Sequence, residues 1–314
     1  MSPPREVRKV LLLLAAALVT LTGCSTPAPA DPPAPAPSAP PAYAGTTAGV
    51  TVELVAVGDI ACEPGEATTP TTCQQQATAD LTTRLDPDRV LALGDLQYEN
   101  GTVASFAASW AKSWGRFSDR LLAVPGNHEY NTTGAAGYRD YLGAPTHAVV
   151  ELGTWRVYLM DSNCEQDACA AQIDWLTADL AAHPATCTAV AMHHPRWSSG
   201  AHGPQLFLQP LWEILVDSGV DLDLAAHDHD YERFDRLDVT GHTVTGTAAG
   251  TRQFVVGTGG KSFYEVREQR TGSQFLQNDR FGVLDLILRD EGYDWSYVDT
   301  DGEVLDRGTD TCST

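Results

Sequence analysis

The sequence is poor in positive charge. It carries 20 Lys plus Arg against 41 Asp plus Glu, which gives its 314 residues a formal net charge of -21 at pH 7. A surface of this sign repels the phosphates of nucleic acids and of anionic lipids, so neither is expected as the main partner. It also repels small anions, unless bound cations supply positive charge where those anions bind.

Long apolar runs and Cys-x-x-Cys motifs are also absent. The apolar run over residues 10–21 ends at Thr22-Gly23, whereas a membrane-spanning helix needs roughly 20 apolar residues. No Cys-x-x-Cys motif occurs, which argues against a structural zinc site built from cysteines. No internal repeat was found either, so a repeat architecture is not expected.

The first residues predict export and a lipid anchor. Arg5, Arg8 and Lys9 precede the apolar run, which is how a secretory signal begins. Residues 21–24, Leu-Thr-Gly-Cys, resemble the lipobox of bacterial lipoproteins, whose cysteine is acylated and becomes the new N-terminus. We therefore predict a lipoprotein signal peptide over residues 1–24, with Cys24 anchoring the protein to the membrane outside the cytoplasm. Ordinary secretory cleavage, or a cysteine present by chance, is the alternative.

The rest of the chain divides into a linker and one domain. Residues 25–45 are rich in Pro and Ala, with little to bury and with φ restricted at each proline, so they predict an extended linker. Residues 46–314 are enough for a single domain with a substantial core.

Apart from Cys24, the cysteines predict three disulfides. An even number of cysteines in an exported protein is typical of a disulfide framework. Close spacing favours Cys62 with Cys73 and Cys164 with Cys169, which leaves Cys187 for Cys312 by elimination.

The pattern of apolar residues predicts an α/β domain with much parallel sheet. Runs apolar on both faces, typical of central strands, lie at residues 52–57, 89–93, 120–124, 156–160, 187–192, 220–225 and 254–257. Helical patterns lie between them, at residues 77–85, 172–182 and 211–219. The tail over residues 281–305 alternates like antiparallel strands, with a turn at residues 300–302.

Polar clusters follow five of these strands directly. They are Gly58-Asp59, Gly94-Asp95, Gly126-Asn127-His128-Glu129, His193-His194 and His227-Asp228-His229. Ligands of open α/β sheets bind outside the carboxyl ends of the strands, so the five clusters are expected to face one another. A single Gly-Asp or His-x-His is more often a turn or a filler, but five in succession at strand ends favour one site.

The candidate ligands form a mixed oxygen and nitrogen set. They are Asp59, Asp95, Tyr98, Asn127, His193, His227 and His229. Such a set suits iron, zinc or manganese better than calcium. The number of ligands fits two metal ions, with Asp95 as the natural bridge between them. The chemistry this predicts is metal-assisted hydrolysis of a phosphate ester.

From Gly58 to His229 the chain resembles the calcineurin-like metallophosphoesterases, and among them the purple acid phosphatases. The five motifs occur in that family's order. The resemblance implies a four-layer α/β/β/α sandwich with two metal ions, Fe³⁺ plus Zn²⁺, Mn²⁺ or Fe²⁺. It implies that Asp59, Tyr98 and His229 bind the ferric ion. It also implies that Asn127, His193 and His227 bind the divalent ion and that Asp95 is shared.

Two departures from the family's pattern affect the loops and not the ligands. Ala61 stands where the family's first motif has a glycine. In the wider superfamily a histidine ligand occupies this place, and Tyr98 compensates for it, as in purple acid phosphatases. The family's usual Gly-His-x-His has Ala226 in place of its glycine.

The resemblance also implies catalytic histidines. His128 and His202 correspond to the pair that contacts the phosphate and protonates or stabilises the leaving alkoxide. His194 directly follows a ligand and is expected to point away from the metals. Glu129 and Asp228, like Asp230, are candidates to orient ligating imidazoles, with solvated loop acids as the alternative.

These observations predict a phosphate monoesterase that acts on small phosphate esters, binds no nucleic acid and is a monomer. A phosphodiesterase or nucleotidase with the same site is the first alternative. A metal-stabilised surface binding lipoprotein without turnover is the second.

Overall fold

Strands and helices alternate along the chain and build two sheets. The computed structural model describes residues 45, 51–164, 169–245 and 250–313, all of which belong to the compact unit formed by residues 40–314. The predicted signal peptide and nearly all of the predicted linker lie outside the described residues. Among the residues described, no helix combines the length and apolar character needed to cross a membrane.

The first sheet has the strand order β13-β12-β11-β1-β2-β3. Its strands are β1 (Val52–Val57), β2 (Arg89–Leu93), β3 (Leu121–Val124), β11 (Gly282–Arg289), β12 (Gly292–Asp299) and β13 (Val304–Thr311). β1, β2 and β3 are parallel to one another, whereas β11, β12 and β13 are antiparallel. The carboxyl ends of β1, β2 and β3 therefore lie at one end of this sheet.

The second sheet has the order β10-β8-β9-β7-β6-β5-β4. Its strands are β4 (Ala148–Leu152), β5 (Trp155–Leu159), β6 (Cys187–Ala191), β7 (Leu222–Ala225), β8 (Tyr231–Leu237), β9 (Thr251–Val256) and β10 (Ser273–Gln277). β5, β6, β7 and β9 are parallel to one another, and β4 and β8 run against them. β10 pairs antiparallel with β8 and so runs in the same direction as β9.

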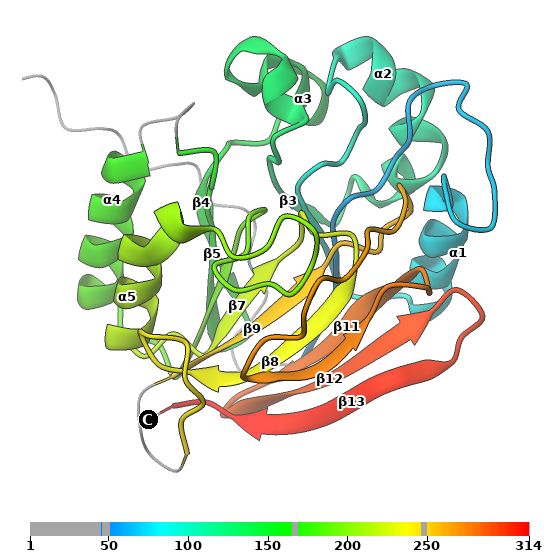
Figure 1. Cartoon of the computed structure of the whole chain (residues 1–314). Coiled ribbons are helices and arrows are strands. Elements are labelled where there is room, and N and C mark those ends of the chain that lie inside the picture. Colours follow the sequence, from blue (N-terminus) through cyan, green and yellow to red (C-terminus); the bar gives the residue numbers. More distant parts are fainter. Residues whose placement is uncertain (1–44, 46–50, 165–168, 246–249, 314) are drawn as a thin grey trace, which may run out of the picture. The chain divides into compact units, whose positions relative to one another are not determined.

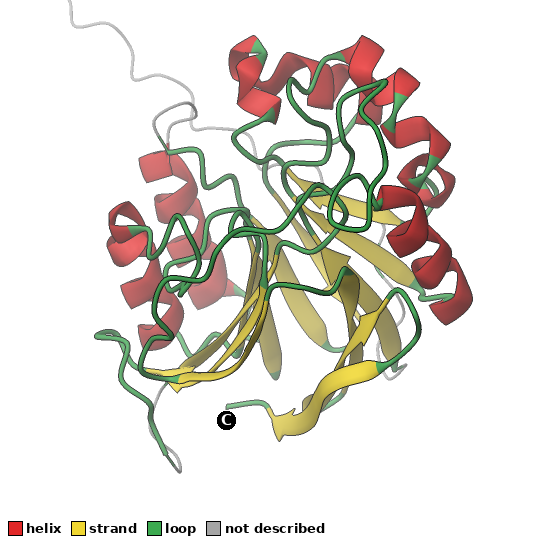
Figure 2. Ribbon diagram, turned by 45° about the vertical axis from the view of Figure 1, so that its right-hand side comes forward, coloured by secondary structure: helices red, strands yellow, loops and turns green. Residues whose placement is uncertain are grey.

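Helices cover the outer faces of the two sheets. The α-helices are α1 (Gln75–Leu85), α2 (Val103–Ala108), α3 (Ala136–Leu142), α4 (Cys169–Ala182) and α5 (Gln209–Asp217). Short 3-10 turns are η1 (Trp110–Lys112), η2 (Trp114–Phe117), η3 (Glu129–Asn131), η4 (Thr133–Ala135) and η5 (Leu206–Leu208). In Figure 1, α4 and α5 lie on one side of the strands and α1 on the other. Figure 2 shows both sheets between these helices, which is the four-layer arrangement that the resemblance implied.

Two clusters of buried apolar side chains hold the layers together. The larger cluster contains residues from both sheets, such as Leu91 and Leu286 of the first and Leu224 of the second. The smaller one joins α5 to the second sheet, for example Leu215 to Val190. α5 faces this sheet because its apolar residues recur at helical spacing.

Most of the predicted elements are confirmed. The strands predicted at residues 52–57 and 89–93 have those bounds, and the antiparallel tail is β11, β12 and β13. The prediction missed β4, β8 and β10. β4 and β10 are edge strands. β8 (Tyr231–Leu237) mixes charged and apolar residues, so it shows neither a continuous apolar run nor a strict alternation of apolar and polar residues.

Two of the predicted disulfides are confirmed. Cys62 is bonded to Cys73 and Cys187 to Cys312. The second bond joins the start of β6 to the residue after β13, and so ties one sheet to the other. Cys164 is also disulfide-bonded, but the side chain of its predicted partner, Cys169, lies outside the described residues.

Candidate metal centre

The predicted ligands lie on loops that leave the carboxyl ends of strands in both sheets. Asp59 follows β1, Asp95 and Tyr98 follow β2, Asn127 follows β3, His193 follows β6, and His227 and His229 follow β7. The chain therefore brings together side chains from five strands of two sheets.

Three of these residues have a left-handed backbone. The φ angles are 58° at Asp59, 46° at Asp95 and 72° at His227. This conformation costs a residue with a Cβ on the order of 1–3 kcal/mol, and such strain is concentrated at functional sites. Hydrogen bonds hold the turns in place: the N–H of His227 donates to Asp59 Oδ2 at 2.9 Å, and that of His128 to Asp95 Oδ1 at 2.8 Å.

Glycines allow the two sheets to approach each other at this site. Gly94 has a φ of 84°, and a Cβ there would lie 2.6 Å from Nδ1 of His193. A Cβ on Gly58 would lie 2.5 Å from the Cβ of Ala226. Gly58 therefore leaves the room that Ala226 occupies, which explains why the chain tolerates alanine before His227.

Tyr98 is the centre of the first group of donors. Its hydroxyl lies 2.7 Å from Asp59 Oδ1, 3.1 Å from Asp95 Oδ2 and 3.0 Å from His229 Nε2. Tyr98 is 2% exposed and Asp59 is fully buried. Burial, followed by the charges of Asp59 and Asp95, raises the pKa of Tyr98 well above its usual value. A phenolate at this position therefore needs a nearby cation.

His193 is the centre of the second group. Its Nε2 lies 3.2 Å from Asn127 Oδ1, 3.3 Å from His227 Nδ1 and 3.4 Å from Asp95 Oδ2. Its Nδ1 lies 2.8 Å from the carbonyl oxygen of Leu93, which fixes the orientation of the ring. Burial opposes protonation, but the Asp95 carboxylate, the charge of Asp59 and the hydrogen bond to the Leu93 carbonyl together outweigh it and raise the pKa of His193 to about 9.

Asp95 belongs to both groups. The same oxygen, Oδ2, faces Tyr98 and His193. Carboxylate oxygens, a phenol, an amide oxygen and imidazoles in two groups that share one carboxylate fit a pair of metal ions. The structure thus gathers all seven predicted ligands into one site, in which Asn127 and His227 are partly exposed and the other five are buried.

His128 and His202 contact different members of this cluster. The His128 ring lies 4.2 Å from the Tyr98 ring, and its Nε2 is 3.8 Å from Asp95 Oδ2. Its Nδ1 lies 2.8 Å from the carbonyl oxygen of Glu99, so this nitrogen is the one that carries a proton. The His202 ring lies 4.3 Å from that of His227.

Two of the candidate orienting acids hold loops and not imidazoles. Glu129 is fully buried and accepts hydrogen bonds from the N–H groups of Leu96, Gln97 and Gly126, so it joins the loops after β2 and β3. Burial, and then the charge of Asp95, raises the pKa of Glu129 to about 8.

Asp228 organises the loop that carries His202. Its buried carboxylate accepts hydrogen bonds from the Ser198 hydroxyl and from the N–H groups of His202 and Gly203. Asp230 is fully buried as well, and neither of its carboxylate oxygens has a hydrogen-bond partner within the described part of the chain. The expectation that these acids orient imidazoles is therefore not met, nor is the alternative that they are solvated.

His194 differs from its prediction, because it does not point away from the cluster. One nitrogen of its ring lies within 4.8 Å of ligand atoms of His193 and His227. Its Nδ1 is 2.9 Å from the Ser162 hydroxyl, and burial lowers the pKa of His194 to about 3. The two adjacent histidines after a strand could have indicated that both lie near the site. Their orientation, however, depends on the turn after β6.

Two residues that contact His229 were not predicted from the sequence. The Tyr264 ring stacks on the His229 ring at 3.8 Å, and the Ser262 hydroxyl lies 3.0 Å from its Nδ1. Both residues come from the loop after β9, whose polar residues follow no recognisable motif.

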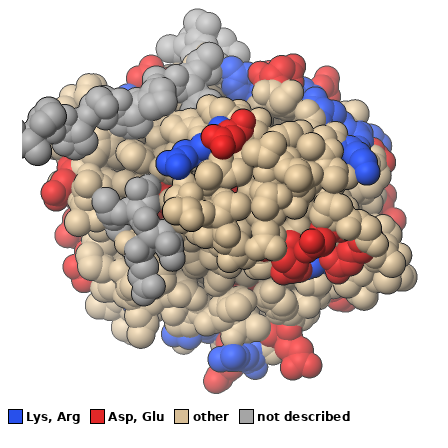
Figure 3. Space-filling model, turned by 90° about the horizontal axis from the view of Figure 1, so that it is seen from above, with Lys and Arg blue, Asp and Glu red and all other residues tan. Residues whose placement is uncertain are grey.

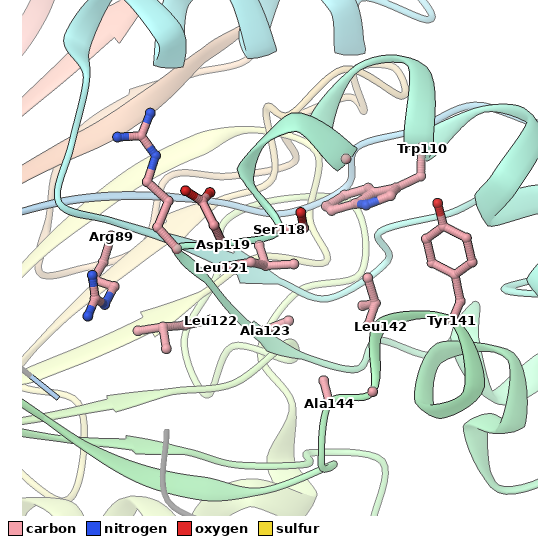
Figure 4. Close-up of a pocket in the computed structure, with 13 residues that line it drawn as sticks. Arg89, Trp110, Ser118, Asp119, Leu121, Leu122, Ala123, Tyr141, Leu142 and Ala144 are labelled. Atoms are coloured by element: carbon pink, nitrogen blue, oxygen red, sulfur yellow. The ribbon is translucent and has the colours of Figure 1, made fainter. Parts of the chain in front are cut away.

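Two cavities differ in their relation to the cluster. One of about 490 Å³ adjoins it, and we call it the Phe207 pocket; residues that line it include Asn127, Tyr130, Asn131, Asn163, His194 and Phe207. The other, of about 410 Å³, lies beside the edge strand β3, between residues such as Arg89, Trp110 and Tyr141 (Figure 4). The second cavity contains none of the predicted site residues.

Much of the face that carries α2 and α3 is uncharged. Seen from above, this face shows broad areas without Lys, Arg, Asp or Glu (Figure 3). The acidic side chains that give the chain its net negative charge therefore leave broad areas of this face uncovered.

Comparisons with known proteins agree with this geometry. Residues 53–231 match the family model of the calcineurin-like phosphoesterases, and this range contains every predicted ligand. Purple acid phosphatase 15 of Arabidopsis thaliana is 27% identical over 203 residues, which are 48% of this chain and 36% of that protein. Purple acid phosphatase 23 of the same plant is 24% identical over 233 residues, 60% of this chain and 50% of that protein. The matches thus span half or less of these plant relatives.

A solved structure shares the fold. The purple acid phosphatase PPD1 from yellow lupin (Lupinus luteus) superposes with a TM-score of 0.65 at 19% identity. The match covers 86% of this chain and 55% of the lupin chain.

Proposed function

Because the chain belongs to the calcineurin-like phosphoesterase family, we propose that it hydrolyses phosphate monoesters at a centre of two metal ions. The observation that carries the proposal is the position of Asp95. Its Oδ2 lies 3.1 Å from the Tyr98 hydroxyl and 3.4 Å from His193 Nε2, so one carboxylate joins two groups of donors. A single ion would not require both groups.

The ligands divide between the two ions as their contacts suggest. Asp59, Tyr98 and His229 would hold the first ion. Asn127, His193 and His227 would hold the second, with Asp95 between them. When bound, such ions acidify water and neutralise charge on phosphoryl oxygens. The hard phenol oxygen of Tyr98 supports Fe³⁺ as the first ion, with Zn²⁺, Mn²⁺ or Fe²⁺ as the second.

His128 and His202 act on the substrate in this proposal. Hydrolysis breaks the bond between phosphorus and the ester oxygen, and the departing alkoxide must take up a proton. The Nδ1 of His128 donates to the Glu99 carbonyl, so Nε2 is the atom that faces the substrate, and in the imidazolium form Nε2 can donate to a phosphoryl oxygen. The His202 ring lies beside that of His227, a position from which it can deliver the proton.

We also propose that the protein works outside the cytoplasm, as a monomer attached by Cys24. The two disulfides among the described residues support an oxidising location, because such bonds rarely persist in the cytosol. The lipid anchor rests on the sequence of residues 1–24 alone. Labelling with a radioactive fatty acid, compared between the full chain and Cys24→Ala, tests it.

Metal removal and replacement tests the two-ion centre. Protein purified without chelators is expected to contain two metal ions per chain and, if iron is one of them, to absorb visible light through the phenolate. Dialysis against a chelator should abolish hydrolysis of nitrophenyl phosphate, and added metal should restore it. One ion per chain at full activity would contradict the proposal. Two ions with no iron would leave the hydrolase in place but remove the ferric assignment.

A comparison of substrates separates the proposal from its alternatives. Nitrophenyl phosphate should be hydrolysed faster than its bis-ester; the reverse would favour a phosphodiesterase. The variant His128→Ala should keep both metal ions and lose most of its activity. If the protein were a binding lipoprotein without turnover, neither the wild type nor His128→Ala would hydrolyse the substrate.

A further inference from the structure

The Phe207 pocket adjoins the proposed metal centre directly. Asn127 lines the pocket while its side-chain oxygen lies 3.2 Å from Nε2 of His193. His194 also lines it and contacts the His227 ring at 4.4 Å. A phosphoryl group bound at the cluster can therefore extend its alcohol portion into this cavity. At about 490 Å³ the cavity lies within the usual range for small-molecule sites.

The lining of the pocket carries no fixed charge. Among the described residues that line it, none is Lys, Arg, Asp or Glu. A second phosphate or a carboxylate on the substrate would find no cation to pair with there. The lining therefore suits an uncharged alcohol portion.

Aromatic rings form part of the wall. Phe207 is 49% exposed, and its ring meets that of His194 edge to face at 5.8 Å. The Tyr130 hydroxyl donates to Asp161, which holds that ring in place. A half-exposed aromatic ring at the edge of a cavity offers a face for another ring to stack on.

Two amides add hydrogen-bond acceptors. The Asn131 side-chain nitrogen donates to the Glu99 carbonyl at 2.8 Å, and that of Asn163 donates to Asp161 at 2.9 Å. These bonds fix which end of each amide is the NH₂ group. The other end is the oxygen, which can accept a hydrogen bond from a ligand. Rings with amino or hydroxyl groups at their edges meet both requirements.

We propose that the Phe207 pocket binds the alcohol portion of the substrate, and that the preferred substrates are phosphate monoesters of nucleosides. This inference rests on the proposed phosphatase activity and narrows its substrate class to nucleotides, so within a phosphate monoesterase it favours the nucleotidase that the sequence left as an alternative. In the reaction, water adds to phosphorus, the ester bond to the nucleoside oxygen breaks, and that oxygen takes a proton. The products are inorganic phosphate and a neutral nucleoside.

The test compares Phe207→Ala with a matched control from the same turn. Leu206 neighbours Phe207 in η5, is 69% exposed and does not line the pocket, so Leu206→Ala removes a similar exposed side chain. Adenosine 5′-monophosphate and glycerol 3-phosphate are the two substrates. The wild type should have the higher kcat/KM for the nucleotide. Phe207→Ala should raise the KM for the nucleotide roughly tenfold and leave glycerol 3-phosphate unchanged, because it removes one stacking contact. Leu206→Ala should change neither.

Several results would overturn the inference. They are a wild-type preference for glycerol 3-phosphate, an equal effect of Phe207→Ala on both substrates, or an equal effect of Phe207→Ala and Leu206→Ala. Hydrolysis of neither substrate by the metal-loaded wild type would instead count against the proposed function. Calorimetric titration with adenosine then tests the pocket without turnover. Weaker binding to Phe207→Ala than to wild type supports the pocket, and equal binding rejects it.

Discussion

Replacing Asp228 by asparagine tests whether this buried acid positions His202 for catalysis. Its carboxylate accepts three hydrogen bonds, from the Ser198 hydroxyl at 2.5 Å and from the N–H groups of His202 at 2.7 Å and Gly203 at 3.1 Å. Asparagine has nearly the same shape but presents one oxygen and one NH₂ group. Whichever way the amide turns, at least one backbone N–H group then faces another donor.

The size of the effect follows from the lost bond. A hydrogen bond to a charged group contributes about 1.5–3 kcal/mol, which corresponds to roughly ten- to a hundredfold in the population of the ordered loop. If His202 protonates the leaving group, kcat should fall by about this factor for an alkyl phosphate such as glycerol 3-phosphate. It should fall much less for nitrophenyl phosphate, whose leaving group needs little help from an acid.

The assay is therefore the ratio of kcat values for the two substrates, measured with metal content as a control. Asp228 lies between two proposed ligands, so the variant must first be shown to keep both ions. His202→Ala gives the full effect of losing the acid, and the double variant should be no slower than His202→Ala alone. The reasoning is refuted if Asp228→Asn slows both substrates equally, or if its effect adds fully to that of His202→Ala.

The remaining predictions concern stability. Asp223 is fully buried in β7 without a hydrogen-bond partner among the described residues, and burial raises its pKa from 3.8 to about 8. The folded protein therefore holds a proton that the unfolded chain releases, so the contribution of Asp223 is lost as pH rises from about 4 to 8. Asp223→Asn should match wild type in urea unfolding at pH 4 and be more stable at pH 8, by roughly 5 kcal/mol, because the raised pKa makes ionisation of Asp223 costly in the folded protein; an equal difference at both values would contradict this. The disulfide Cys187–Cys312 closes a sequence separation of 125 residues and Cys62–Cys73 one of 11. Replacing the first pair by serine should therefore lower the free energy of unfolding by about 4–5 kcal/mol, and the second by about 3 kcal/mol. The opposite order would rule out chain entropy as the main cause.

The sequence by itself determined the α/β alternation and the identities of the clustered donor residues. Both depend on local patterns. A short apolar run predicts a buried strand, and a Gly-Asp or His-x-His pair after it marks the carboxyl end. The carboxyl ends of parallel strands share one end of a sheet, so the meeting of Asp59 with Asp95 followed from chain order alone. The same argument from strand ends predicted that His193 and His229 join them, whereas the division of these strands between two stacked sheets was implied only by the family resemblance.

Only the tertiary structure decided what each polar side chain outside the donor cluster contacts. Asp228 and Glu129 could not be distinguished in the sequence from solvated acids, because burial depends on which loops close over them. His194 turns toward His227 because of the bend after β6, and no spacing rule encodes that bend. The Phe207 pocket likewise joins residues after β3, after β5 and in η5. The physical reason is the same in each case: strand periodicity is local, whereas burial and orientation depend on how the two sheets pack.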